Sequence, residues 1–158
     1  MSTSYVTDLK INTRKSMIEL LNVRLADAID LKLAVKQAHW NIRGSAFIAL
    51  HELLDRIAAR IEEHGDTMAE RIVQIGGIAG GTLQQVSKAT SLPAYPGEIA
   101  AQADHLAALC DRFQEFAKSC RAAIDQASDA GDADTADIMT GVSRNTDKDL
   151  WFIAAHLG

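Results

Sequence analysis

Apolar residues recur at steps of three and four along four long segments of the chain, a spacing typical of helices that bury one face. The first segment follows Asn12 or Thr13, either of which can cap a helix, and runs to about Trp40. The second follows Ser45, another candidate cap, and ends at the Gly76-Gly77 pair. Its long and regular stripe consists of Phe47, Leu50, Leu54, Ile57, Ile61, Met68, Ile72 and Ile75.

The second half of the chain predicts two more helices, over residues 98–127 and 135–156, separated by the acidic turn SDAGDAD. Before them lies a crossover that reaches Pro96 and is long enough to hold a short helix around residues 82–87. Two antiparallel helix pairs joined by one long crossover are the ferritin-like form of a four-helix bundle. We therefore predict an all-α, ferritin-like four-helix bundle with a short extra helix in its crossover. It forms one domain, residues 1–158, with a flexible N-terminal segment over 1–12.

Composition agrees with such a bundle and indicates a cytoplasmic protein. A chain of 158 residues buries enough surface to form a core without a metal or a disulfide. Cys110 and Cys120 lie about 15 Å apart along one predicted helix, so they cannot pair with each other. The first sixteen residues contain no apolar run of a secretory signal, and no uncharged run is apolar enough to span a membrane. Free thiols without an export signal favour the cytoplasm.

The second predicted helix carries a cluster of metal-ligand residue types beside its apolar stripe. With His51 set at zero on the helical wheel, Asp55 falls at about 40°, Asp66 at about 60° and Glu70 at about 100°. His51 with Asp55 and Asp66 with Glu70 are four residues apart, which brings the two side chains of each pair together. A carboxylate at the edge of a core is costly unless it is paired or binds a metal. Each pair therefore predicts half of a metal site.

The two pairs cannot meet within one chain, because their midpoints are about 22 Å apart along the helix. The simplest solution is a two-fold dimer in which two copies of this helix run antiparallel, with the axis near Arg60 and Ile61. His51 and Asp55 of one chain would then face Asp66 and Glu70 of the other. We expect two identical sites per dimer, and His39, at the end of the first helix, completes the set.

A site with imidazoles and carboxylates together fits iron(II) or manganese(II), because structural zinc prefers Cys and His, whereas calcium and magnesium prefer oxygen alone. We expect iron, with Zn²⁺, Mn²⁺ or Co²⁺ as competitors. The remaining histidines, His64, His105 and His156, have no partner at ligand spacing and are expected to be structural or solvated. Trp40 and Trp151 are expected in the apolar core, with a place near the metals as the alternative. The string HELLD lacks the second His of the zinc-protease motif HExxH.

Several strings with fixed spacing resemble the Dps family of mini-ferritins, the DNA-protection-during-starvation proteins. They are HWNIRG, the LHELLD segment, DTMAER, the AYP segment around Tyr95, DTADI, DK and LWFI, and they extend over most of the chain. The resemblance implies a dodecameric shell built of two-fold dimers that oxidises iron(II), preferably with hydrogen peroxide, and stores iron(III) inside. In that family the site between subunits uses the positions that are His39, His51, Asp55, Asp66 and Glu70 here, and all five residues match.

Acidic residues also cluster before and at the start of the last predicted helix, where the family places cation pores. The candidate pore residues are Asp137 and, after it, Asp132 or Asp134. The other interpretation is that these carboxylates only cap the helix and pair with its dipole.

DNA binding is expected to be weak or absent, although the best-known family members bind DNA through a lysine-rich extension. Residues 1–16 offer only Lys10, Arg14 and Lys15, offset by Asp8, and the formal charge of the chain is -5. Many weak arms on one shell could still act together. The alternative function is therefore a nucleoid-binding protective shell in which metal oxidation is secondary. A gel shift and peroxide-driven iron oxidation distinguish the two, and a purely structural bundle would bind no iron.

Overall fold

The computed structural model describes residues 3–6 and 8–158, and in this part of the chain every regular element is helical. The predicted order is confirmed, including the short helix in the crossover. The bounds are α1 Ile11–Asn41, α2 Phe47–Gln74, α3 Leu83–Ala89, α4 Gln102–Asp129 and α5 Ala133–Ala154. None of these helices is long and apolar enough to cross a membrane.

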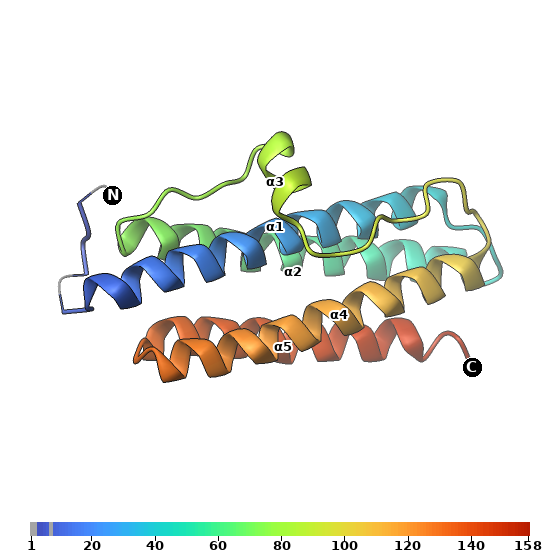
Figure 1. Cartoon of the computed structure of the whole chain (residues 1–158). Coiled ribbons are helices and arrows are strands. Elements are labelled where there is room, and N and C mark those ends of the chain that lie inside the picture. Colours follow the sequence, from blue (N-terminus) through green and yellow to red (C-terminus); the bar gives the residue numbers. More distant parts are fainter. Residues whose placement is uncertain (1–2, 7) are drawn as a thin grey trace.

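The four long helices form two antiparallel pairs, α1 with α2 and α4 with α5, that pack on each other as two layers (Figure 1). Contacts between α1 and α4 and between α2 and α5 join the layers. The core lies between them and is contiguous, with Phe113 and Phe116 of α4 as its largest buried side chains. The apolar stripe expected on α2 is buried from Leu50 onward, including Leu54 and Ile57, whereas its first member, Phe47, is 40% exposed. The fold prediction is therefore confirmed down to the face that α2 turns inward.

The start of α2 is capped from another helix rather than by Ser45, so the prediction of a Ser45 cap is wrong. The first residue outside the helix is Ala46, whose backbone N–H donates to Oε1 of Gln102 at 3.1 Å. Gln102 is in turn the first residue of α4, four residues later than expected. The delay has a physical cause, because the backbone of Arg43 bridges Ala101 in extended conformation and bonds Ala100 and Gln102. Residues 98–101 are therefore drawn out of the helix.

The end of α2 lies where the Gly76-Gly77 pair predicts it. Gly76 adopts a φ of 89°, and its N–H bonds the carbonyl of Val73 while the N–H of Gly77 bonds that of Ile72. This is a Schellman ending, which requires a left-handed residue that glycine supplies without steric cost. The two glycines that predicted the end of the helix therefore make it.

The crossover returns over α1 and is fixed there at two places. The Asn22 side chain accepts from the N–H of Gly80 at 2.8 Å and donates to the carbonyl of Ile78 at 3.1 Å. Further along, the buried Asp27 accepts from the N–H of Ser91 at 2.7 Å and from its hydroxyl. Between these two anchors lies α3, which begins with a Thr82 capping box and sits on α1 (Figure 1). The crossover is thus held against the α1–α2 layer.

Part of the predicted N-terminal segment also lies against the bundle. The N–H of Tyr5 donates to the carbonyl of Gln74 at 2.9 Å, at the end of α2. The first helix begins at Ile11, so residues 11 and 12 are helical, and the prediction that Asn12 or Thr13 caps this helix is wrong. Residues 1, 2 and 7 are outside the described part of the chain, and the flexibility of the segment stays a prediction.

Candidate metal centre

The ligand types expected on α2 share one face of this helix, as the spacing predicts. His51 is half-buried, whereas Asp55, Asp66 and Glu70 are exposed. The arc that these residues occupy therefore lies at the surface of a single chain and not inside its core. A surface arc of carboxylates is available to a metal, to solvent or to a second protein chain.

The end of α1 and the start of α2 hold the two candidate histidines in a reciprocal pair. Nδ1 of His39 lies 2.7 Å from the backbone carbonyl of His51, and Nδ1 of His51 lies 2.8 Å from the carbonyl of His39. The two rings stack with centroids 3.8 Å apart and planes 15° apart. Helix α1 ends at Asn41, so the carbonyl of His39 belongs to its last turn and needs a partner from outside the helix. The ring of His51 supplies that partner.

This pairing fixes which nitrogen of each ring is free. A carbonyl oxygen can only accept a hydrogen bond, so each Nδ1 carries the proton and each neutral ring keeps its lone pair on Nε2. Histidines that ligate metals commonly donate their second ring nitrogen to a carbonyl in this way, which sets both the tautomer and the ring orientation. His39 and His51 are therefore prepared to act as ligands through Nε2, although the two residues lie twelve positions apart.

Asp55 lies next to this histidine pair and forms an ion pair with a lysine of α1. Its Oδ1 is 4.0 Å from Nε2 of His39 and 2.7 Å from Nζ of Lys36. The hydrogen bond and the charge of the Lys36 ammonium lower the pKa of the Asp55 carboxyl. The same ammonium lies 5.6 Å from the ring centroid of Trp40. A cation that binds between His39 and Asp55 must therefore compete with Lys36.

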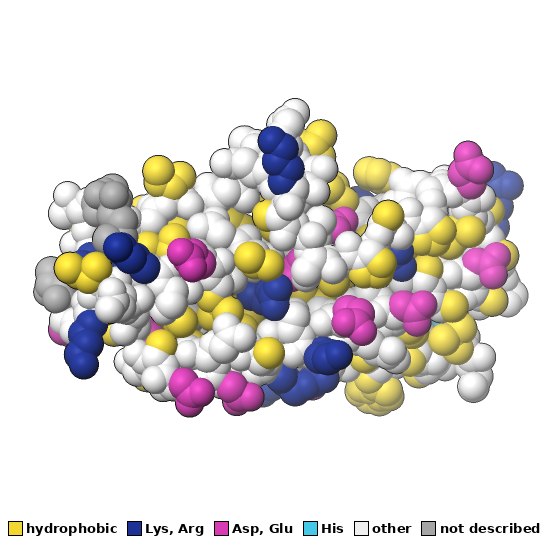
Figure 2. Space-filling model, in the orientation of Figure 1, with side chains coloured by type: hydrophobic (Ala, Val, Ile, Leu, Met, Phe, Trp, Pro, Cys, Tyr) yellow, Lys and Arg dark blue, Asp and Glu magenta, His cyan; other side chains and the backbone are white. Residues whose placement is uncertain are grey.

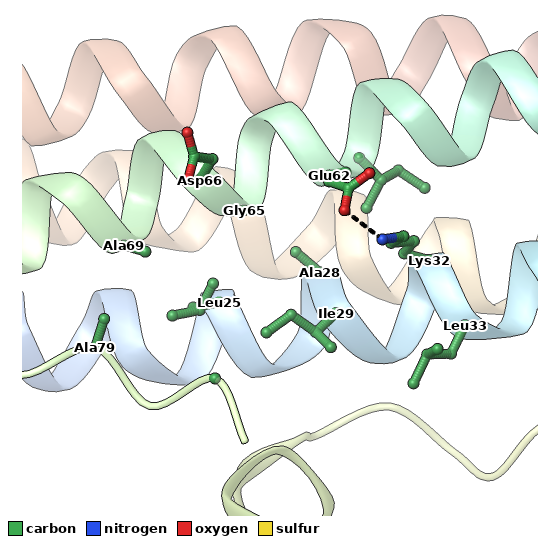
Figure 3. Close-up of a pocket in the computed structure, with 12 residues that line it drawn as sticks. Leu25, Ala28, Ile29, Lys32, Leu33, Glu62, Gly65, Asp66, Ala69 and Ala79 are labelled. Carbon is green, nitrogen blue, oxygen red and sulfur yellow. Dashed lines mark hydrogen bonds and ion pairs between the residues drawn. The ribbon is translucent and has the colours of Figure 1, made fainter. Parts of the chain in front are cut away.

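The second carboxylate pair, Asp66 and Glu70, lies at the other end of α2. Asp66 borders an apolar groove of about 320 Å³ between α1, α2 and the crossover. Figure 3 shows Asp66, Gly65 and Glu62 along α2, opposite Leu25 and Ala28 of α1, with Lys32 paired to Glu62 at 2.6 Å. In the described residues, no group of three or more His, Cys, Asp and Glu is placed to hold a metal ion. Within one chain, the five predicted ligands thus form two separate groups.

The opposite face of α2 binds α5 and takes no part in the ligand arc. Arg60 makes a two-pronged ion pair with the buried Asp149, at 2.5 and 3.1 Å, so its side chain turns away from the arc. One turn later, Nε2 of His64 lies 3.1 Å from the amide nitrogen of Asn145. Burial lowers the pKa of His64. His64 is therefore structural, as expected, and Arg60 marks only the level of the predicted two-fold axis.

The acidic cluster before α5 divides into one structural and several exposed residues. Asp132 is buried, caps α5 through the N–H of Thr135 at 3.1 Å and accepts from Nη2 of Arg71 at 2.7 Å. Its assignment as a pore residue is wrong, because both carboxylate oxygens are used inside the protein. Asp134 and Asp137 are exposed and remain candidates.

Two features of the site escaped prediction from the sequence. Trp40 and Trp151 are each 65% exposed, so the expectation that they lie in the core of the chain is wrong. Lys36 was not recognised as a partner of Asp55. Its position three residues before His39, on the same face of α1, was the available signal, but the crossing of α1 and α2 decides which residue it meets.

Comparison with known proteins identifies relatives over almost the whole chain. Residues 18–158 match the family model of the ferritin-like domain. The DNA protection during starvation protein of Agrobacterium fabrum is 53% identical over 150 residues, which cover 95% of this chain and 93% of that protein. The fine tangled pili major subunit of Haemophilus ducreyi is 31% identical over 96% of this chain and 80% of its own length.

Solved structures give the same result at the level of the fold. DpsC from Streptomyces coelicolor superposes with a TM-score of 0.95 and 31% identity, covering 100% of this chain and 92% of that one. Dps from Microbacterium arborescens in the high iron form superposes with a TM-score of 0.87 and 34% identity, covering 94% and 96%.

Proposed function

This chain belongs to the Dps family of ferritin-like proteins, and from that membership we propose that it is a ferroxidase. The family relationship supports a protective, iron-storing role as a mini-ferritin. We propose further that it oxidises iron(II), preferentially with hydrogen peroxide, at sites shared between two-fold related subunits. The iron(III) mineral would be stored inside a dodecameric shell, which protects the cell against oxidative stress.

The histidine pair is the observation that carries this proposal. The Nδ1 of each histidine, His39 and His51, donates to the backbone carbonyl of the other, and Nε2 of His39 lies beside the Asp55 carboxylate. Two imidazoles with one carboxylate suit iron(II), the substrate, better than calcium or magnesium. Zn²⁺, Mn²⁺ and Co²⁺ are expected to compete for the same ligands. The solved relative from Microbacterium arborescens is described in a high iron form, which supports iron as the substrate.

The second half of each site is proposed to come from a neighbouring chain. Asp66 and Glu70 are exposed on the same arc as His51 and Asp55 but about 22 Å further along α2. Metal ligands must lie within about 2 to 2.5 Å of the ion, so one straight helix cannot supply both pairs. Two antiparallel copies of α2 related by a two-fold axis would bring each pair opposite the other and create two equal sites.

The chemistry requires two iron(II) ions for each peroxide. Each ion gives up one electron, the O–O bond breaks, two protons are taken up, and the products are two iron(III) ions and two waters. Because both electrons arrive together, hydroxyl radical is not released. Asp55, Asp66 and Glu70 supply the negative charge that stabilises iron(III) relative to iron(II). Hydrolysis of iron(III) to the mineral then returns protons to the solvent.

Peroxide-driven iron oxidation, followed by absorbance, tests the proposal. The parent protein should oxidise iron(II), and Asp55→Ala and Glu70→Ala should each remove most of that activity. Glu63→Ala is the matched control, because Glu63 is an exposed carboxylate of the same helix outside the ligand set. A parent without oxidation, or a Glu63→Ala loss as large as that of Asp55→Ala, would contradict the ligand assignment.

Mixing the two inactive variants tests whether the sites are shared. In a dimer of one Asp55→Ala chain with one Glu70→Ala chain, one site carries both lesions and the other carries neither. Co-refolding the variants at equal amounts should therefore restore about a quarter of the parental sites, since about half of random dimers are mixed. A site built within one chain would give no recovery.

We propose that DNA binding is weak or absent. Lys10 lies directly before α1, and Arg14 and Lys15 lie within it, so these three cations do not form a lysine-rich extension. Figure 2 shows charges of both signs scattered over the face that carries α3, without a continuous basic patch. A gel shift at several salt concentrations tests this, and a shift that persists at physiological salt would favour the nucleoid-binding alternative.

Two smaller assignments complete the proposal. The exposed Asp134 and Asp137 are candidates for an acidic route by which iron reaches the interior. The protein is expected in the bacterial cytoplasm or nucleoid, where the free thiols of Cys110 and Cys120 stay reduced.

A further inference from the structure

Helix α2 exposes two large apolar side chains that the metal site does not use. Ile48, in the first turn, is 63% exposed, and Val73, in the last turn, is 46% exposed. A single exposed isoleucine or valine is common on protein surfaces and needs no explanation. The position of these two relative to the ligands sets them apart.

Both side chains lie on the ligand arc. With His51 at zero, Ile48 falls at about 60° and Val73 at about 40° on the helical wheel, between His51 and Glu70. Along the axis, Ile48 lies one turn outside His51, and Val73 lies one turn outside Glu70. The four ligands of α2 are thus bracketed by one apolar residue at each end.

The bracket is symmetric about the proposed two-fold axis. In two antiparallel copies of α2, facing residues lie equally far from the two-fold axis, on opposite sides of it. This condition holds for His51 with Glu70 and for Asp55 with Asp66. It holds for Ile48 with Val73 as well. Antiparallel pairing that builds the metal sites therefore also sets Ile48 of each chain opposite Val73 of the other.

The charge on the rest of the arc favours an apolar contact at its two ends. Between Ile48 and Val73, most exposed residues on this side of α2 are acidic, namely Glu52, Asp55, Glu62, Glu63, Asp66 and Glu70, and the others are Ala59 and, at the edge of the arc, Arg56. Two such faces repel each other, and the repulsion is strongest where Asp55 meets Asp66 and no cation is bound. Lys36 and Lys32 neutralise only Asp55 and Glu62.

We infer that Ile48 and Val73 form an intersubunit apolar clasp, one at the outer end of each shared metal site, whose occupant is a second copy of this chain. This inference rests on the two-fold site proposed above and goes beyond it, because it assigns the residues that join the subunits before iron arrives. Each clasp also covers the outer end of the ligand set, so bulk water is excluded from that side of the site.

Site-specific cross-linking tests the clasp. Helices that pack side by side have axes about 8–10 Å apart, which suits a short, rigid bismaleimide better than a disulfide. The double variant Ile48→Cys/Val73→Cys should give covalent dimers on a denaturing gel. The single variants Ile48→Cys and Val73→Cys should not, because equal positions on antiparallel copies lie about 37 Å apart. These singles also control for the native, buried Cys110 and Cys120.

A charge exchange provides a second measurement. Val73→Glu adds a carboxylate to the acidic arc and should weaken the metal-free dimer in sedimentation at least tenfold, and Ile48→Lys in the same chain should restore it. Thr67→Glu is the matched control, because Thr67 is exposed on α2 but falls at about 160°, outside the arc.

The outcomes separate the clasp from the function on which it rests. Parental iron oxidation without cross-linking of the double variant, or equal cross-linking of the singles, overturns the clasp and leaves the ferroxidase intact. A parent that oxidises no iron overturns the proposed function. Double-only cross-linking together with charge rescue establishes the contact.

Discussion

Asp132 provides a direct contrast between a structural role and a pore role. Its carboxylate joins the end of α2 to the start of α5, through the Arg71 guanidinium at 2.7 Å, the Thr135 hydroxyl at 2.6 Å and the Thr135 N–H. The side chains of Arg71 and Asp132 are only 5% and 2% exposed. The change Asp132→Ala would leave the buried guanidinium without its closest anion and α5 without its cap.

The expected cost follows from these contacts. Removing one partner of a buried ion pair costs about 3–5 kcal/mol, and loss of a helix cap costs about 1 kcal/mol within that range. Asp134, whose carboxylate lies 3.7 Å from Arg71, can offset part of the loss, so the lower end is expected. For a chain of this size, about 3 kcal/mol lowers the melting temperature by roughly 6–12 °C.

Thermal unfolding followed by circular dichroism measures this effect. Asp132→Asn should fall between the parent and Asp132→Ala, because asparagine keeps the cap and loses the charge. Asp137→Ala is the control and should shift stability by less than about 0.5 kcal/mol, since Asp137 is exposed. If Asp132→Ala melts like the parent but takes up iron slowly, the structural assignment is wrong and the pore assignment is right.

Three further predictions concern other parts of the molecule. Lys36→Gln should raise the pKa of Asp55 toward its usual value and increase the affinity for Co²⁺ a few-fold; NMR titration and calorimetry measure these, and an unchanged pKa would contradict the Lys36–Asp55 contact. Burial lowers the pKa of His64 in the folded chain below 6.5, its usual value. Between the folded and the unfolded pKa the unfolded chain binds more protons, so the free energy of unfolding should fall as the pH drops through 6.5. The fall should be smaller in His64→Gln, and equal slopes in denaturant titrations at pH 5–7 would argue against it. Gly77→Ala would place a Cβ 2.7 Å from Ile72 and 2.8 Å from Ile18 and should cost about 1–3 kcal/mol in the same titration, whereas Gly97→Ala, with open space around it, should cost far less.

The fold could be predicted from the sequence because the residue spacing along α2 determines which of its faces is buried. Steps of three and four fix its buried face, and the ligands at His51, Asp55, Asp66 and Glu70 have angles that follow from the same period. Gly76 and Gly77 likewise mark the end of the helix through local backbone chemistry. Features that lie within one helix are therefore accessible from spacing alone.

Features that depend on two elements were not accessible. The cap of α2 comes from Gln102, fifty-six positions away, and the cation beside Asp55 comes from Lys36 on α1. Asp132 could be recognised as a possible cap, but only the packing of Arg71 against it shows that the carboxylate is buried. Trp40 was expected in the core because it is large and apolar. Its exposure depends on how the helices pack together, which the sequence of one helix does not give. The ligand set and the shared site stay predictions until a metal-loaded structure tests them.

The two anchors of the crossover determine how α3 can move. Asn22 and Asp27 are five residues apart on α1, and they close the stretch that contains α3 into a short loop with both ends fixed. Within α3 only Val86 is buried. A segment with so few apolar contacts can unfold locally, at a free energy well below that of global unfolding, while both anchors hold. The amide hydrogens of α3 should therefore exchange with solvent deuterium long before those in the middle of α1.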